Sequence, residues 1–128
     1  MSDFSTLLAV KDLMSRDVVT APDTITVQQA ARLLAEKKIS SVVLTNGNGE
    51  IAGILTESDI VRHVVAEARD AAATIAREAM SSEVHHIPGD MSIFDARHKM
   101  NALAVKHLIV EEKGKPIGLI SSTALLGS

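Results

Sequence analysis

The sequence contains no cysteine, no tryptophan and no tyrosine, and its two phenylalanines are Phe4 and Phe94. Without cysteine there is no disulfide, no thiolate metal site and no thiol nucleophile, a composition that suits a reducing cytosol. The scarcity of aromatic rings argues against single-strand nucleic-acid binding by base stacking. A net charge of −3 gives no long-range attraction to nucleic acid of any kind.

Long apolar runs are also missing, although 46% of the 128 residues are hydrophobic. The unbroken apolar runs are far shorter than the roughly 18 residues that a membrane-spanning helix needs. The first residues carry no basic region ahead of an apolar stretch, so no secretory signal is predicted. We therefore expect a globular, cytoplasmic protein with an aliphatic interior.

What the sequence does have is an internal repeat. Met14 and Ser15 recur 66 residues later as Met80 and Ser81, and a series of apolar positions follows at the same spacing. The tetrapeptide GILT of residues 53–56 recurs as GLIS at residues 118–121, after one residue is lost in a turn. An ordered series of matches over about fifty positions indicates a tandem duplication.

The repeat predicts three segments of chain. They are a leader of residues 1–9, a first repeat of residues 10–68, and a helical connector with a second repeat over residues 69–128. The connector is expected to be helical because residues 61–80 are rich in Ala, Glu and Arg. Four charged residues of this stretch are then interpreted as a solvated helix face: Arg69, Asp70, Arg77 and Glu78.

Each repeat predicts the order strand, helix, strand, strand, helix. In the first, Thr26 and Gln29 have the spacing of a capping box at the start of a helix that ends near Lys37 and Lys38. β-Branched runs on both sides of a glycine-rich turn then predict a hairpin. The second repeat follows the same order, with a helix from Ser92 to about Leu103. The fold class is therefore α+β, and repeats this small are expected to share a core.

Residues 53–60, GILTESDI, resemble the signature of the cystathionine-beta-synthase (CBS) domain: glycine, two apolar residues, Thr or Ser, two variable residues, and Asp. The opening Met-Ser-x-x-Val-x-x-x-Pro and the order of elements match as well, twice, over about residues 10–127. The resemblance implies a stand-alone pair of β-α-β-β-α repeats, a Bateman module, packed with pseudo-twofold symmetry. It also implies a homodimer, and two clefts between the repeats that bind adenosyl ligands.

The resemblance assigns Asp59 to the ribose, whose two hydroxyls an ionised carboxylate can accept. Thr56 lies at a helix start, where free N–H groups favour a phosphate. Gly53 is expected to let the strand backbone approach the ligand. The alternative is a purely structural capping box, with Thr56 as N-cap and Asp59 three residues later. The two interpretations are compatible, because capping would orient the same side chains.

Lys106 and His107 are the predicted phosphate contacts. They match basic positions in CBS pairs that resemble the gamma subunit of AMP-activated kinase, whereas the equivalents in the first repeat, Ser40 and Ser41, are uncharged. The alternative is that Lys106 protects an edge strand from association. The complete predicted ligand-binding set is Asp59, Thr56, Ile54, Ser58, Lys106, His107, Val84, His86 and Ser40.

The second copy of the signature has Ala124 where the first has Asp59. A methyl group accepts no hydrogen bond from ribose, so the cleft around Ser121 is expected to bind adenosyl ligands poorly.

No metal site is predicted, because the adjacent His85 and His86 would point to opposite faces of an extended segment. No catalytic pair and no required cofactor are predicted either. We therefore expect a regulatory, non-enzymatic module that binds AMP, ADP, ATP or S-adenosylmethionine and signals to a partner protein. No nucleic acid or membrane is expected as a partner, and the alternative is a ligand-free oligomerisation scaffold.

Overall fold

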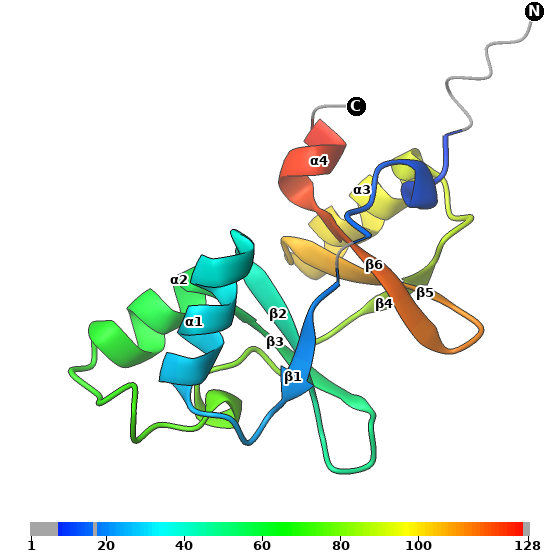
Figure 1. Ribbon diagram of the computed structural model, residues 1–128. Coiled ribbons are helices and arrows are strands. Elements are labelled where there is room, and N and C mark those ends of the chain that lie inside the picture. Colours follow the sequence, from blue (N-terminus) through cyan, green and yellow to red (C-terminus); the bar gives the residue numbers. More distant parts are fainter. Residues whose placement is uncertain (1–7, 17, 127–128) are drawn as a thin grey trace, which may run out of the picture. The chain divides into compact units, whose positions relative to one another are not determined.

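A computed structural model describes residues 8–16 and 18–126, which belong to two compact units (Figure 1). One is the Val19–Val84 unit, and the other, called the split unit, joins residues 1–18 to residues 85–128. Each unit contains one three-stranded sheet. In both sheets the first strand is parallel to the second, and the second is antiparallel to the third.

Both units repeat the predicted order of elements. The Val19–Val84 unit contains β1 (Thr20–Pro22), α1 (Val27–Lys37), β2 (Ser41–Thr45), β3 (Ile51–Thr56), α2 (Glu57–Ile60), a π-helical turn (Val61–Val65) and a 3-10 turn (Ala76–Glu78). The split unit contains a 3-10 turn (Val10–Asp12), β4 (His86–Pro88), α3 (Ile93–Leu103), β5 (His107–Glu112), β6 (Lys115–Ser121) and α4 (Ser122–Leu126). The α+β class and the order β-α-β-β-α are confirmed in each unit.

Helix α1 shows why these elements form where the sequence predicts them. The Gln29 N–H donates to Thr26 Oγ1 at 3.0 Å, and the Thr26 N–H donates to Gln29 Oε1 at 2.9 Å, which completes the capping box. The helix ends at Lys37, and the C-cap residue Lys38 has a left-handed φ of 55°. Between these ends, Val27, Ala30 and Leu34 form the buried face.

The interior of each unit is aliphatic. Leu44 and Leu55 are fully buried in the core of the Val19–Val84 unit, and Leu108 and Ile120 are fully buried in the core of the split unit. The aromatic Phe94 is 73% exposed, while Phe4 lies outside the described residues. Within residues 8–16 and 18–126, no helix has the length and apolar character to cross a bilayer.

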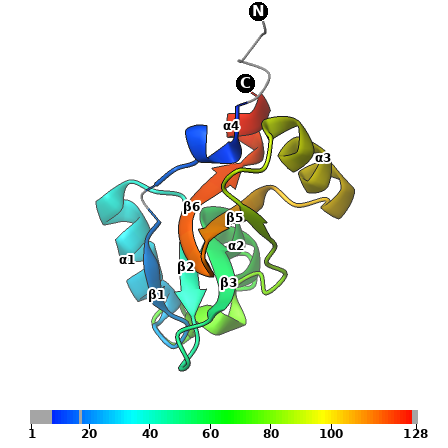
Figure 2. The ribbon, with the colours of Figure 1, turned by 90° about the vertical axis from the view of Figure 1, so that its right-hand side faces the viewer.

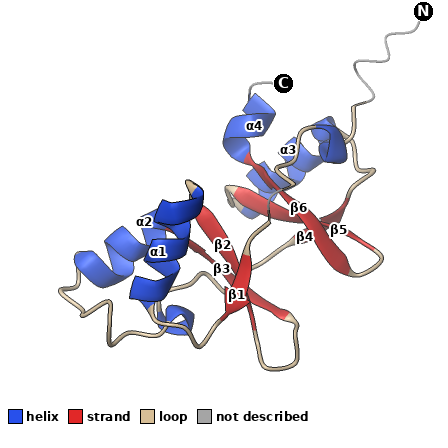
Figure 3. Cartoon of the chain, viewed as in Figure 1, coloured by secondary structure: helices blue, strands red, loops and turns tan. Residues whose placement is uncertain are grey.

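The connector is not the helix that its composition predicts. After the π-helical turn, the chain runs as turns and loop until the short 3-10 turn Ala76–Glu78 (Figure 3). The reason lies in the tertiary structure. Backbone carbonyls that would accept hydrogen bonds within a connector helix accept them from the start of α1 instead. The Ala71 and Thr74 carbonyls accept from the Gln28 and Val27 N–H groups, at 3.1 and 2.8 Å. Such contacts override the weak preferences of individual residues.

The four charged residues of the connector are exposed, as predicted, but they do not share one helix face. Arg77 holds the buried Asp23 through two hydrogen bonds, Nε to Oδ2 at 3.1 Å and Nη2 to Oδ1 at 3.3 Å. The hydrogen bond to Asp23 is the largest cause that raises the pKa of Arg77, and the negative charge of Asp23 adds to it. Arg69 pairs with Glu78 at 2.8 Å. The Arg77–Asp23 pair joins the connector to the segment that follows β1, whereas the Arg69–Glu78 pair joins two parts of the connector.

The Met-Ser segment that opens each sequence repeat packs in the unit of the other repeat. Ser81, which opens the second repeat, bridges to Ile54 of the first, and Ser15, which opens the first, bridges to Leu119 of the second. Figure 2 shows the 3-10 turn Val10–Asp12, in blue, beside the helices of the split unit, where the Val10 N–H donates to the Met91 carbonyl at 2.9 Å. The compact units are thus divided differently from the predicted sequence segments.

Candidate functional site

Thr56 and Asp59 lie where β3 ends and α2 begins. Thr56 Oγ1 accepts from the Asp59 N–H at 3.0 Å, and Asp59 Oδ2 accepts from the Thr56 N–H at 3.0 Å. The structural capping box is therefore present. It fixes the Asp59 side chain, which is 17% exposed, with Oδ1 at 4.0 Å from Nε2 of His63. Ligand binding by the Asp59 carboxylate stays a prediction. The capping box holds this carboxylate in the position from which it would bind.

The missing side chain of Gly53 leaves room for another segment of this chain, whereas the sequence suggests room for a ligand. Ser81 crosses β3 at this point, and it exchanges two backbone hydrogen bonds with Ile54, of 3.0 and 2.9 Å. A Cβ atom at Gly53 would lie 2.5 Å from the Ser81 carbonyl oxygen and 2.6 Å from Met80 Sδ. No side chain fits there. Gly118 has the same role in the split unit, where a Cβ atom would lie 2.8 Å from the Ser15 carbonyl oxygen.

Three other predicted residues lie near this end of β3. Ile54 is buried and pairs with Val43 across the sheet. Because side chains alternate along a strand, Ile54 and Thr56 share one face of β3. The Ser40 carbonyl accepts from the Glu57 N–H at 3.1 Å, which places Ser40 beside the start of α2. Ser58 is exposed on α2 itself. These residues and Asp59 therefore gather at one end of the sheet.

Val84 ends the Val19–Val84 unit and is half-buried. The remaining predicted residues belong to the split unit. Lys106 is exposed, and its carbonyl accepts from the Ser122 N–H at 2.9 Å, while His107 lies opposite Ser121 in the sheet. His86 Nδ1 lies 2.7 Å from Glu111 Oε2 within the same unit. The convergence of these residues with Asp59 on one ligand stays a prediction.

The second copy of the signature has only half of the capping box. Ser121 Oγ accepts from the Ala124 N–H at 3.3 Å, but Ala124 has no side-chain acceptor that could return the bond. The position that fixes a carboxylate in the Val19–Val84 unit therefore holds a methyl group here. The expectation that adenosyl ligands bind weakly around Ser121 depends on this difference.

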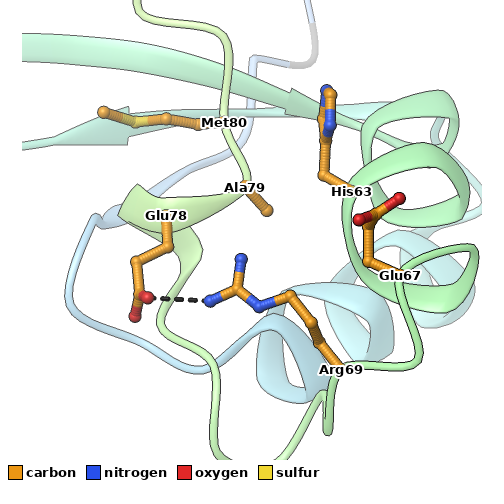
Figure 4. A pocket seen from close by; sticks show the side chains of 6 residues that line it. All are labelled: His63, Glu67, Arg69, Glu78, Ala79 and Met80. Carbon is orange, nitrogen blue, oxygen red and sulfur yellow. Dashed lines mark hydrogen bonds and ion pairs between the residues drawn. The ribbon is translucent and has the colours of Figure 1, made fainter.

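A pocket of about 470 Å³ lies within the Val19–Val84 unit (Figure 4). Its lining consists of His63, Glu67, Arg69, Glu78, Ala79 and Met80. His63, which lies near Asp59 Oδ1, links the pocket to the Thr56–Asp59 box. In the sequence, His63 follows Asp59 by four residues. The sequence could not indicate the pocket, because the pocket exists only when the connector folds back as loop.

No group of three or more His, Asp or Glu side chains in the described part of the chain is placed to hold a metal ion. The profile of the CBS domain family matches residues 10–66 and 76–128. The chain belongs to the CBS domain family. It is a CBS domain pair, and the geometrically equivalent crossings at Gly53 and Gly118 are the structural counterparts of its two repeats.

Among its relatives, this CBS pair is 34% identical to an uncharacterized protein of Methanopyrus kandleri over 93% of this chain and 61% of that one. It covers a quarter or less of several other curated proteins that it matches. A solved CBS-domain protein of Burkholderia ambifaria is 35% identical, with a TM-score of 0.77, over 87% of this chain and 81% of that one.

A further solved CBS domain pair was crystallised with 5′-methylthioadenosine and S-adenosyl-L-methionine. It is 22% identical, with a TM-score of 0.81, over 94% of each chain. At this identity the likeness shows that the two proteins share a fold.

Proposed function

We propose that this CBS pair is a regulatory module of the cytosol that binds one adenosyl ligand per chain. Its candidate ligands are AMP, ADP, ATP and S-adenosylmethionine. Binding would change the surface that the module presents to a partner protein, and no catalytic step is part of the proposal. The observation that carries it is the fixed, part-buried carboxylate of Asp59 at the end of β3.

The geometry of Asp59 suits a ribose diol. Capping uses one hydrogen bond at Oδ2, whereas an ionised carboxylate has about four acceptor sites. Two hydroxyls can therefore still donate to it, and the burial of the side chain limits competition from water. Ile54, on the same face of β3 as Thr56, is the aliphatic side chain that we propose as the contact for a base, in a chain with no tyrosine or tryptophan to stack.

Calorimetric titration and thermal melting with the four candidate ligands test the proposal. A ligand at a hundredfold excess over its Kd stabilises the folded state by about 2.7 kcal/mol, a shift of several degrees for a domain of this size. We expect at least one ligand to give this shift in the parent chain, and Asp59→Ala to remove it.

The matched control is Gln29→Ala. It breaks the equivalent capping box at Thr26 in the same unit but touches no predicted ligand residue. Both variants keep the N-cap threonine but lose the reciprocal hydrogen bond of the capping box, which should cost about 1 kcal/mol of stability. Only Asp59→Ala should also lose the ligand shift. If none of the four ligands shifts the melt of the parent chain, the proposal fails.

The second candidate function is ligand-free oligomerisation, and one observation favours it. Val61 and Val65 lie one helical turn apart on the π-helical turn, and they are 58% and 67% exposed. Adjacent exposed apolar side chains are typical of association surfaces. If this function is correct, ultracentrifugation should show a homodimer that Val61→Ser with Val65→Ser dissociates, and the melting temperature should rise with concentration and ignore all four ligands.

A further inference from the structure

The pocket lined by His63 contains charged side chains of both signs. Arg69 Nη2 donates to Glu78 Oε1 at 2.8 Å, and Glu67 supplies a second carboxylate from the opposite wall. Figure 4 shows His63 and Glu67 on the helical side of the pocket, Glu78 and Ala79 on the other, and the Arg69 guanidinium between them. The lining is therefore amphoteric rather than basic.

This arrangement of charge discriminates between classes of ligand group. A polyphosphate would meet two carboxylates, whereas a simple cation would meet a guanidinium. A guanidinium has five N–H donors, so Arg69 can keep Glu78 and still donate to a second carboxylate. An ammonium group would find an acceptor at Glu67 or Glu78. Met80 and Ala79 offer apolar contact for a short alkyl or thioether stem.

The pocket also lies close to the predicted ribose position. His63, one helical turn after Asp59, lines the pocket and places Nε2 at 4.0 Å from Asp59 Oδ1. A ligand with its ribose on Asp59 could therefore extend its 5′ substituent into the pocket. All of these residues belong to the Val19–Val84 unit.

We propose that this pocket binds an α-amino-acid zwitterion, with its carboxylate on Arg69 and its ammonium on Glu67 or Glu78. The zwitterion arrives either as a free amino acid or as the amino-acid end of S-adenosylmethionine. The second source rests on the proposed function, because it requires the ribose at Asp59.

Calorimetric titration with three probes tests this assignment. S-Adenosylmethionine carries the zwitterion on an adenosyl group, 5′-methylthioadenosine has the adenosyl group alone, and L-methionine has the zwitterion alone. For the adenosyl source, the parent chain should bind S-adenosylmethionine at least tenfold more tightly than 5′-methylthioadenosine. Arg69→Gln should bring that ratio near one and leave the affinity for 5′-methylthioadenosine unchanged. Arg32→Gln, an exposed arginine on α1 outside the pocket, should leave the ratio unaltered.

For the free amino acid, L-methionine should bind the parent chain and Asp59→Ala alike, and Arg69→Gln should lose it. Equal affinity for S-adenosylmethionine and 5′-methylthioadenosine, with no binding of L-methionine, would overturn the assignment and leave the proposed function intact. Binding of L-methionine without any adenosyl ligand would refute the proposed function and support the pocket. Arg69→Gln should fold normally, because the side chains of its ion pair are 35% and 47% exposed and surface pairs of this kind contribute little to stability, and its melting curve checks this.

Discussion

Replacing Gly53 by alanine separates two explanations of the glycine in the CBS signature. The sequence suggests a close approach to ligand, whereas the structure places the chain itself there. A Cβ atom would lie 2.5 Å from the Ser81 carbonyl oxygen and 2.6 Å from Met80 Sδ. The sulfur belongs to a flexible side chain and can move, but the carbonyl belongs to backbone and accepts a hydrogen bond from Ile54 at 3.0 Å.

The size of the effect follows from these contacts. Forcing an extra methyl group into a packed site costs about 1–3 kcal/mol. Displacing Ser81 also weakens the two backbone bonds that it exchanges with Ile54, each worth about 1 kcal/mol. Because the chain would relax part of this strain, we expect Gly53→Ala to lower the free energy of unfolding by about 2–4 kcal/mol.

Urea denaturation of Gly53→Ala beside Gly47→Ala measures this effect. Gly47 lies in the β2–β3 turn, where a Cβ atom would meet nothing within 4 Å, so its replacement should leave stability unchanged or raise it by up to about 1 kcal/mol. The reasoning is refuted if Gly53→Ala is as stable as Gly47→Ala. If such a stable variant also loses ligand binding, the glycine serves the ligand after all.

Three further predictions follow from the same contacts. Ala124→Asp should complete the second capping box and raise stability by about 0.5–1 kcal/mol through one added hydrogen bond; if a carboxylate there suffices for ribose, titration should show two ligands per chain instead of one. Thr26→Ala should lower stability by about 1 kcal/mol in urea denaturation, and a value near zero would mean that the box does not hold α1 in solution. Arg77→Gln should lower the melting temperature more than Arg69→Gln does, because it leaves the buried Asp23 without its cation. Since Asp23 raises the already high pKa of Arg77, the guanidinium stays charged and the loss should be constant from about pH 7 to about pH 10; a loss that fades across this range would contradict the assignment.

Local signals along the chain were enough to place most of the fold. The capping box at Thr26 and Gln29 marked the start of α1, and the alternation of apolar runs with glycine-rich turns marked both hairpins. The same kind of signal placed Thr56 and Asp59 at a helix start, where their hydrogen bonds are now seen. Each of these features depends on residues close to one another along the chain, so sequence spacing describes it fully.

The connector could not be predicted in this way. Its alanines, glutamates and arginines favour a helix locally, yet Ala71 and Thr74 bond to the start of α1, and Arg77 bonds to Asp23, 54 residues away. These partners are distant in sequence, so no window of composition contains them. The pocket lined by His63 and Arg69 exists only because the connector folds back in this manner.

By itself, the sequence determined the duplication, the α+β order of each repeat, the aliphatic interior and the asymmetry between Asp59 and Ala124. Tertiary structure alone decided what Gly53 accommodates, which unit each Met-Ser segment joins, and that His63, next to Asp59, lines a charged pocket. The physical reason is the range of the interactions. Caps, turns and strand alternation are fixed by neighbours along the chain, whereas crossings and pockets are fixed by atoms that only folding brings within a few ångströms.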